Sequence, residues 1–324
     1  MLPRGCKLCL TPIDGLAKSG AMNTSRSPRG YLVCFLLFSI VCGVAHPAGA
    51  ATACVWRVTN APAPFYLVGT IHALSGKDYP LPKPYAEALH NSQQFFFEVD
   101  LHQKSDFGDR FERAASYPKG DDIRRHIHPK TWEFLAKRFR NSNYLGKSFH
   151  IGRNYIEGIQ ELRPWAIVDF FWGVSGYSDL SNEYGVDNYF FFQARRTGKE
   201  CGALETPEEH VDVLRGMADI DAELLLLDAL VRGDKRRDDF NATRAGWRHG
   251  DMGAMLAEGK RVRDLNPGGE IRLLDYRNLR WIPKIVTLIK SGVPTSIVVG
   301  SGHFCGPNSV IELLQKKGYK IEQL

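Results

Sequence analysis

Short apolar runs, separated by glycine, proline and polar residues, predict strands at both ends of the chain. Residues 55–58 and 65–68 flank a proline-rich loop and predict a β-hairpin. Four further strands are predicted at 94–100, 201–204, 295–299 and 319–323. In the strand 94–100 the period of two places Glu98 and Asp100 on one face.

The long middle of the chain has apolar residues at helical spacing instead. The predicted helices are 85–91, 130–140, 156–172, 187–197, 207–217, 221–230, 268–279 and 308–317. Pro307 suits the first position of the last helix, and Gly318 suits the position just after it. Terminal strands with helices between them indicate an α/β fold. We therefore expect a single domain with a central mixed sheet and a helical cap.

The first 50 residues have the pattern of a signal peptide, so the predicted domain is 51–324. Two arginines precede an apolar run over 31–44, and small residues follow it. This run is too short for a comfortable membrane span, which favours cleavage over an uncleaved anchor. Met22 is a natural start for such a signal, so residues 1–21 are a candidate for a mistaken extension.

Most of the net positive charge lies in this segment and not in the predicted domain. The chain carries a formal charge of +6, but residues 1–50 hold five basic residues and one acidic residue, which leaves the domain at +2. Nucleic-acid binding needs a clustered basic surface, so no nucleic-acid partner is expected. Contact with a membrane is expected only through an uncleaved signal.

Only three of the seven cysteines belong to the predicted domain: Cys54, Cys201 and Cys305. In an oxidising compartment two of the three could pair, and the sequence leaves the pairing open. Cys305 lies close to a candidate site residue. We expect a structural role for its thiol, because buried packing is the commonest fate of cysteine.

Two Gly-x-x-His segments carry the most distinctive chemistry of the chain. The segment from Gly69 to His72 follows the predicted strand 65–68, and the segment from Gly300 to His303 follows the strand 295–299. Ligand sites of α/β sheets lie at the carboxyl ends of strands. If both strands belong to one sheet, both loops lie at one edge and the two histidines share a site.

Glu98 is the natural third member of that site, because it also closes a predicted strand. Two histidines and one carboxylate are a common ligand set for zinc, manganese or cobalt. The same groups could act as general acid and base without a metal. Asp100 is the alternative carboxylate, and an edge carboxylate facing solvent is the structural alternative.

Three further residues are candidates for catalytic roles. Glu205 follows the strand 201–204, at the start of a helix where acidic residues also serve as caps. Arg277 and Asn278 lie in a polar, aromatic segment. An arginine near the histidines could bind a substrate carboxylate or stabilise an oxyanion, although a helix-surface arginine is the simpler interpretation.

Taken together, the segments resemble the TraB/PrgY/GumN family, also called Tiki-like, over residues 55–324. The resemblance rests on Tyr66–His72, Glu98, Pro164–Trp165, Gly185–Asp187 with Gly198–Lys199, Leu204–Thr206, Arg277–Asn278 with Trp281, and Val299–Val310. It implies an α/β fold shared with erythromycin-esterase-like and haem-binding ChaN-like proteins. The Tiki members are metal-dependent proteases, and the match carries over His72, His303 and Glu98, followed by Arg277 and Asn278.

One residue departs from the family pattern. The family often has glutamine where this chain has His210. An extra metal ligand is one interpretation of His210, and a histidine on the surface of a helix is the one favoured by the sequence.

The expected function is a secreted or periplasmic hydrolase that uses a divalent ion, manganese, cobalt or zinc, to cleave peptide or amide bonds. The alternative is a non-catalytic protein of the same fold that binds a peptide signal, haem or a component of polysaccharide export, because a fold does not fix a function. The expected partner is a peptide or small-molecule substrate. The substrate, the metal and the oligomeric state stay open.

Overall fold

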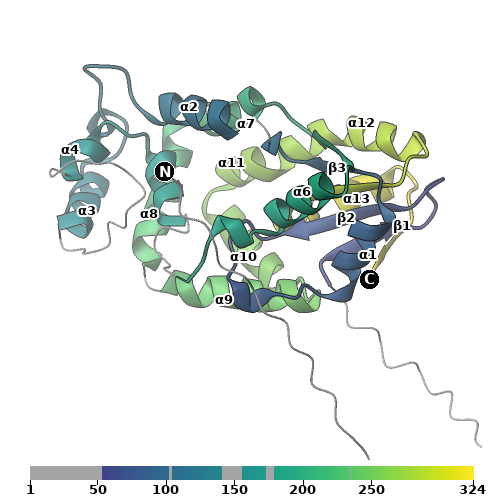
Figure 1. Cartoon of the computed structure of the whole chain (residues 1–324). Helices are drawn as coiled ribbons and strands as arrows, with labels where there is room; N and C mark the ends of the chain where they lie inside the picture. The colour runs from purple at the N-terminus through teal and green to yellow at the C-terminus, as the bar shows by residue number, and fades with distance from the viewer. Residues whose placement is uncertain (1–52, 102–103, 141–154, 173–178, 234) are drawn as a thin grey trace, which may run out of the picture. The chain divides into compact units, whose positions relative to one another are not determined.

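The computed structural model of the protein describes residues 53–101, 104–140, 155–172, 179–233 and 235–324 (Figure 1). These residues all belong to one compact unit, 47–324. The predicted signal segment 1–50, with its four cysteines, lies outside the described residues.

One six-stranded sheet forms the centre of the fold. Its strands are β1 (Val55–Val58), β2 (Phe65–Thr70), β3 (Gln94–Phe97), β4 (Glu200–Ala203), β5 (Thr295–Gly300) and β6 (Ile321–Gln323). Their order across the sheet is β4-β3-β5-β2-β1-β6. β4, β3, β5 and β2 run parallel, whereas β1 is antiparallel to both β2 and β6. The predicted α/β class and mixed sheet are therefore confirmed.

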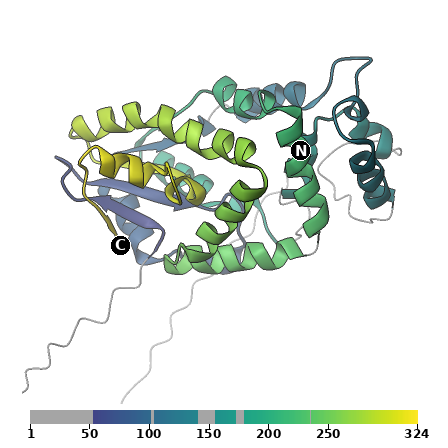
Figure 2. The same ribbon diagram turned by 180° about the vertical axis from the view of Figure 1, so that it is seen from behind.

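The two central strands are buried along almost their whole length because helices cover both faces of the sheet. All six residues of β2 and the first five of β5 are buried, as expected for parallel strands inside an α/β fold. Helices α1 (Lys83–Asn91) and α6 (Val186–Arg196) cover one face (Figure 1). Helices α12 (Tyr276–Lys290) and α13 (Val310–Lys316) cover the other face (Figure 2).

The middle of the chain forms the predicted helical part, which has a hydrophobic cluster of its own. Its helices are α2 (Lys104–Ala115), α3 (Pro129–Arg140), α4 (Tyr155–Gln160), α5 (Pro164–Trp172), α7 (Pro207–Arg215) and α8 (Asp219–Arg232). Then follow α9 (Lys235–His249), α10 (Gly253–Leu265), α11 (Pro267–Glu270) and the π-helical turn Ile271–Asp275. Among the described helices, none combines the length and the hydropathy that a membrane span requires.

Several boundaries differ from the predictions for local reasons. The helix predicted over 156–172 is broken between α4 and α5, since the residue before Pro164 avoids helical geometry. The N-cap of α13 is Ser309, whose hydroxyl accepts the backbone N–H of Glu312, so the helix begins after Pro307 and not at it. Gly318 follows that helix at φ 88°, as predicted. The strand predicted over 94–100 ends at Phe97.

Candidate functional site

Four functional side chains follow the carboxyl ends of the four parallel strands. His72 comes two residues after β2, Glu98 directly after β3, Glu205 two residues after β4, and His303 lies in the short turn after β5. Because these strands are parallel neighbours, their ends meet at one edge of the sheet. Both Gly-x-x-His loops lie at this edge, as predicted.

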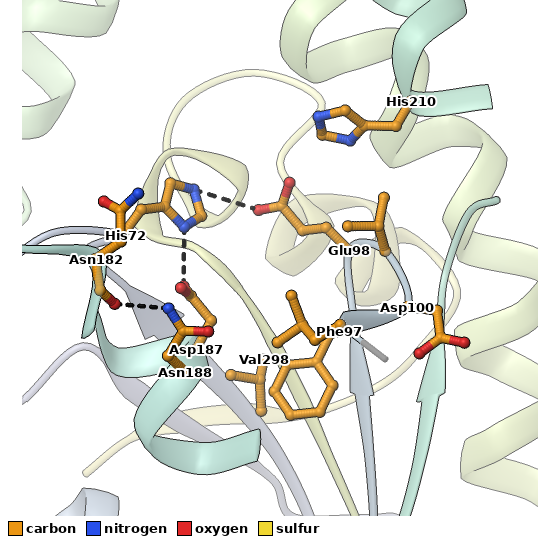
Figure 3. Close-up of a pocket in the computed structure, with 11 residues that line it drawn as sticks. His72, Phe97, Glu98, Asp100, Asn182, Asp187, Asn188, His210 and Val298 are labelled. Atoms are coloured by element: carbon orange, nitrogen blue, oxygen red, sulfur yellow. Dashed lines mark hydrogen bonds and ion pairs between the residues drawn. The ribbon is translucent and has the colours of Figure 1, made fainter. Parts of the chain in front are cut away.

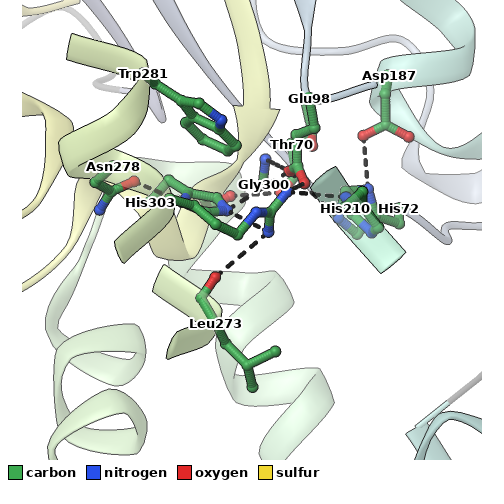
Figure 4. A network of polar contacts seen from close by, with 12 residues as sticks. Thr70, His72, Glu98, Asp187, His210, Leu273, Asn278, Trp281, Gly300 and His303 are labelled. Atoms are coloured by element: carbon green, nitrogen blue, oxygen red, sulfur yellow. Dashed lines mark hydrogen bonds and ion pairs between the residues drawn. The ribbon is translucent and has the colours of Figure 1, made fainter. Parts of the chain in front are cut away.

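The two histidines face the same carboxylate oxygen. The Nε2 atom of His72 lies 3.8 Å from Oε1 of Glu98, and the Nε2 atom of His303 lies 3.8 Å from that same oxygen. Figure 3 shows His72 and Glu98 turned toward each other across the pocket, and Figure 4 shows His303 on the side of Asn278 and Trp281. The three predicted metal ligands are thus brought together.

His72 is oriented by the first turn of α6. Its Nδ1 atom lies 2.9 Å from Oδ1 of Asp187. A carboxylate only accepts hydrogen bonds, so Nδ1 carries a proton and Nε2 is the nitrogen turned to Glu98. The Asp187 carboxylate also raises the pKa of His72 to about 9. Gly185 makes this approach possible, because a Cβ atom there would lie 2.3 Å from the carbonyl oxygen of His72.

His303 is oriented in the same sense by an amide. Its Nδ1 atom lies 2.7 Å from Oδ1 of Asn278. The Asn278 amide cannot be reversed without losing its Nδ2 hydrogen bond to the carbonyl of Asn308, at 3.0 Å. Burial and the nearby Arg277 cation lower the pKa of His303 to about 3. Its ring is therefore neutral, and the lone pair on Nε2 faces Nη1 of Arg277, 3.2 Å away.

Arg277 is buried between two carboxylates. Its Nη2 atom donates to Oε2 of Glu98 at 2.5 Å and to Oε1 of Glu205 at 2.6 Å. Its guanidinium lies 4.7 Å from the ring centre of Trp281, whose indole N–H donates to Glu205. Burial raises the pKa of Glu98, but Arg277 and the histidines outweigh it and hold that pKa well below its usual range. Glu98 is thus kept ionised.

His210 belongs to this network, and its interpretation as a helix-surface residue was wrong. Helix α7 carries the imidazole to the pocket, where its Nδ1 atom lies 2.6 Å from Oε1 of Glu205. Thr206 caps that helix and fixes its start beside Glu205. Glu205 therefore points into the site while Thr206 caps, as predicted for these two residues.

Glu98, Glu205 and His210 form a second group of potential ligands, with ligand atoms within 4.8 Å of one another. Nη2 of Arg277 already lies among them, 2.5 Å from Glu98, 2.6 Å from Glu205 and 3.2 Å from His210. A guanidinium therefore fills the position that a cation would take. The guanidinium also reaches Nε2 of His303, at 3.2 Å from its Nη1 atom, whereas His72 and Glu98 line the pocket.

The pocket at this edge has a volume of about 420 Å³. It is lined by His72, Phe97, Glu98, Val99, Asp100, Leu101, Asn182, Asp187, Asn188, His210 and Val298 (Figure 3). A volume of this size suits a small ligand or a short piece of a polymer. Asp100 lines the pocket, but it is Glu98 that contacts the histidines and Arg277.

The three cysteines of the described chain do not line the pocket. Cys54, Cys201 and Cys305 are free thiols in the described chain. The Cys305 thiol contacts the carbonyl of Ser301 at 3.4 Å, and burial raises its pKa to about 12. A protonated, packed thiol agrees with the structural role predicted for Cys305.

The sequence did not assign roles to Asp187 or to Trp247. Asp187 lies two residues after Gly185, in the first turn of α6. A carboxylate just after a glycine at a helix start could have indicated a residue that faces a strand end. Trp247 lies on the polar helix α9, and its indole N–H donates at 2.9 Å to the carbonyl of Gly69. The hydroxyl of Tyr85 donates to that carbonyl too, at 2.8 Å. Only the tertiary structure shows that these two rings hold the first glycine loop.

Comparison with known proteins identifies the family of the chain. A sequence model of the TraB/PrgY/gumN family matches residues 54–323, so the chain belongs to that family. It is 22% identical to Metalloprotease TIKI homolog of Nematostella vectensis, over 83% of this chain and 66% of that protein. It is 24% identical to Metalloprotease TIKI2 of Xenopus tropicalis, over 87% of this chain and 61% of that protein. The chain thus spans about two thirds or less of each relative's length.

Proposed function

We propose that the protein is a metal-dependent hydrolase of peptide or amide bonds, in which His72, His303 and Glu98 hold a divalent ion. The observation that carries this proposal is the shared 3.8 Å distance of both Nε2 atoms from Oε1 of Glu98. Each ring is also held at Nδ1 by an oxygen of Asp187 or Asn278. Histidine ligands of metals are typically oriented in this way. Metalloprotease relatives support the same class of reaction.

The bound ion would supply Lewis-acid activation of water and of the substrate carbonyl. The chain's own residues would hold the ligands in place. Arg277 keeps Glu98 ionised, and Asn278 keeps Nε2 of His303 unprotonated. The donors of Arg277 contact Glu98, Glu205 and His303, and the donor of Asn278 contacts the carbonyl of Asn308. We therefore propose that both residues position the ligands and do not stabilise an oxyanion.

Glu205 and His210 would act next to the ligands. Glu205 accepts hydrogen bonds from Arg277, Trp281 and His210, so it has little capacity left for a substrate. Of this pair, His210 lines the pocket and Glu205 holds its ring in place at Nδ1.

We place the reaction in a secreted or periplasmic compartment, on the basis of the signal pattern of residues 1–50. Manganese, cobalt and zinc all suit two imidazoles and a carboxylate, and the choice among them is left to metal analysis.

Metal analysis and a peptide-library digest test the proposal. We expect the wild type to bind one equivalent of Mn²⁺, Co²⁺ or Zn²⁺ and to cleave library peptides, and we expect His72→Ala and His303→Ala to lose both properties. His90→Ala is the matched control, because His90 is exposed on α1. Equal cleavage by wild type and both site variants would refute the proposal. Stoichiometric peptide binding without products, by metal-loaded protein, would favour the binding protein instead.

A further inference from the structure

The pocket beside Glu98 has polar flanks and one apolar side. Its polar groups come from His72 and Asp187 on one flank and from His210 and Asp100 on the other. Its apolar side is formed by Phe97, Val99, Leu101 and Val298. Figure 3 shows Phe97 and Val298 together below Glu98, with His72 and Asp187 on one flank and Asp100 on the other.

A bend in the backbone produces this apolar side. In a regular strand, Glu98 and Val99 would point to opposite faces of the sheet. The strand ends at Phe97, and residues 98 and 99 form a bend. Glu98 and Val99 therefore line the same pocket, and Leu101 joins them. Val99 and Leu101 are only partly buried, so their apolar surface is open to a ligand.

We propose, resting on the hydrolase function above, that this apolar side is a specificity pocket for the substrate residue next to the cleaved bond. It would take an aliphatic or aromatic side chain of the size of leucine or phenylalanine. The apolar surface begins one residue away from Glu98, a proposed metal ligand, so the side chain next to a carbonyl bound at this site would lie close to it.

The physical chemistry of the surroundings favours an apolar occupant over a charged one. A polar side chain against Phe97 and Val298, both almost fully buried, would lose water without gaining a hydrogen bond from them. An acidic side chain would also meet Asp100 and Asp187 at the rim. A lysine reaching Asp100 is the competing arrangement, and it must be tested directly.

The test uses metal chelators that differ only in side chain, so it does not depend on turnover. The probes are the N-acetyl hydroxamates of leucine, phenylalanine, aspartate and lysine, titrated calorimetrically into manganese-loaded protein. We expect the leucine and phenylalanine compounds to bind about tenfold or more tightly than the aspartate and lysine compounds, the size of effect that one buried apolar side chain supplies. Equal affinities, or a preference for lysine, would overturn the proposal.

Substitutions assign the preference to the apolar side of the pocket. Val99→Asp should remove most of the preference for leucine, and the nearly isosteric Val99→Thr should reduce it while preserving the fold. Both variants should bind Mn²⁺ as the wild type does. Val231→Asp is the matched control, since Val231 is 71% exposed on α8. An unchanged preference in Val99→Thr and Val99→Asp would place the selectivity elsewhere and refute the assignment.

The two proposals fail in different ways. Selective hydroxamate binding by a protein that cleaves no library peptide would remove the hydrolase function and keep the apolar pocket as a ligand site. Peptide cleavage without a preference for apolar residues beside the cleaved bond would keep the hydrolase and remove the specificity pocket.

Discussion

The two loop glycines meet different neighbours, although they hold the same position in their motifs. A Cβ atom at Gly69 would lie 3.0 Å from the backbone oxygen of Cys54. A Cβ atom at Gly300 would lie 3.2 Å from Oε1 of Glu98 and 3.3 Å from Nε2 of His72. The first glycine is therefore required for packing, and the second keeps the space between the proposed ligands open.

Substitution by alanine should therefore reduce stability at Gly69 and metal affinity at Gly300. Gly69→Ala should lower the free energy of unfolding by about 1–3 kcal/mol through overpacking. Gly300 has φ −49° and ψ 135°, which alanine adopts freely, so Gly300→Ala should keep its stability and lose about 10–100-fold in Mn²⁺ affinity. Urea denaturation and metal titration of both variants check this. A stable Gly69→Ala together with an unfolded Gly300→Ala would contradict it.

Asp187 should act on the metal through His72. Asp187→Asn removes the carboxylate that fixes the Nδ1 proton, and we expect the affinity for Mn²⁺ to fall about 10–100-fold. The melting temperature of the metal-free protein should change little, because one surface-facing pair contributes only about 1 kcal/mol. Asp179→Asn is the matched control, since Asp179 pairs with Arg237. Equal metal affinities in the two variants would exclude this role for Asp187.

Among the helical segments, His126 and two carboxylates form a connection between separate elements. His126 follows the short turn 123–125, and its ring bonds Asp219 at the start of α8 at 2.9 Å and Asp121 at 3.0 Å. It stacks on Tyr117 with ring centres 4.3 Å apart. Burial lowers the pKa of His126, but the two carboxylates outweigh it and raise that pKa above its ordinary value.

This raised pKa predicts a pH-dependent stability. The folded state holds the proton more tightly than the unfolded state, so the stabilisation is complete below the unfolded pKa of about 6.5 and is lost as the pH rises through the folded-state pKa. Urea denaturation of wild type and His126→Gln at about pH 6 and about pH 8.5 should show a smaller decrease in the variant. A decrease of equal size in both proteins would show that His126 is not the cause.

Prediction from sequence succeeded for elements whose apolar pattern reflects the sheet. The strands of the sheet and three of the helices that pack on it, α1, α6 and α13, were found, because burial imposes their periodicity. The polar helix α9 and the helix α12, which continues through Pro283, were missed or cut short because tertiary contacts stabilise them. His72, Glu98 and His303 could be placed because each comes at the end of a predicted apolar strand or shortly after it. The pairing of His210 with Glu205 required the structure.

For the whole molecule, the ion should act as a stabilising ligand. A ligand that binds only the folded state adds about 2.7 kcal/mol at a concentration one hundred times its dissociation constant, which corresponds to a rise of roughly 5–10 °C in melting temperature. We expect Mn²⁺ to produce such a rise, EDTA to reverse it, and the double variant His72→Ala, His303→Ala to show none. A rise that persists in the double variant would indicate a metal site elsewhere.

The order of strands in the sheet has a consequence for biosynthesis. β5 lies between β3 and β2, yet it is nearly the last strand to leave the ribosome. Until residues 295–300 emerge, β1 with β2 and β3 with β4 are two separate pairs, and His72 has no shared sheet that holds it beside Glu98. A nascent or truncated chain therefore lacks the assembled site. The proposed proteolytic activity would therefore begin only when synthesis is almost complete.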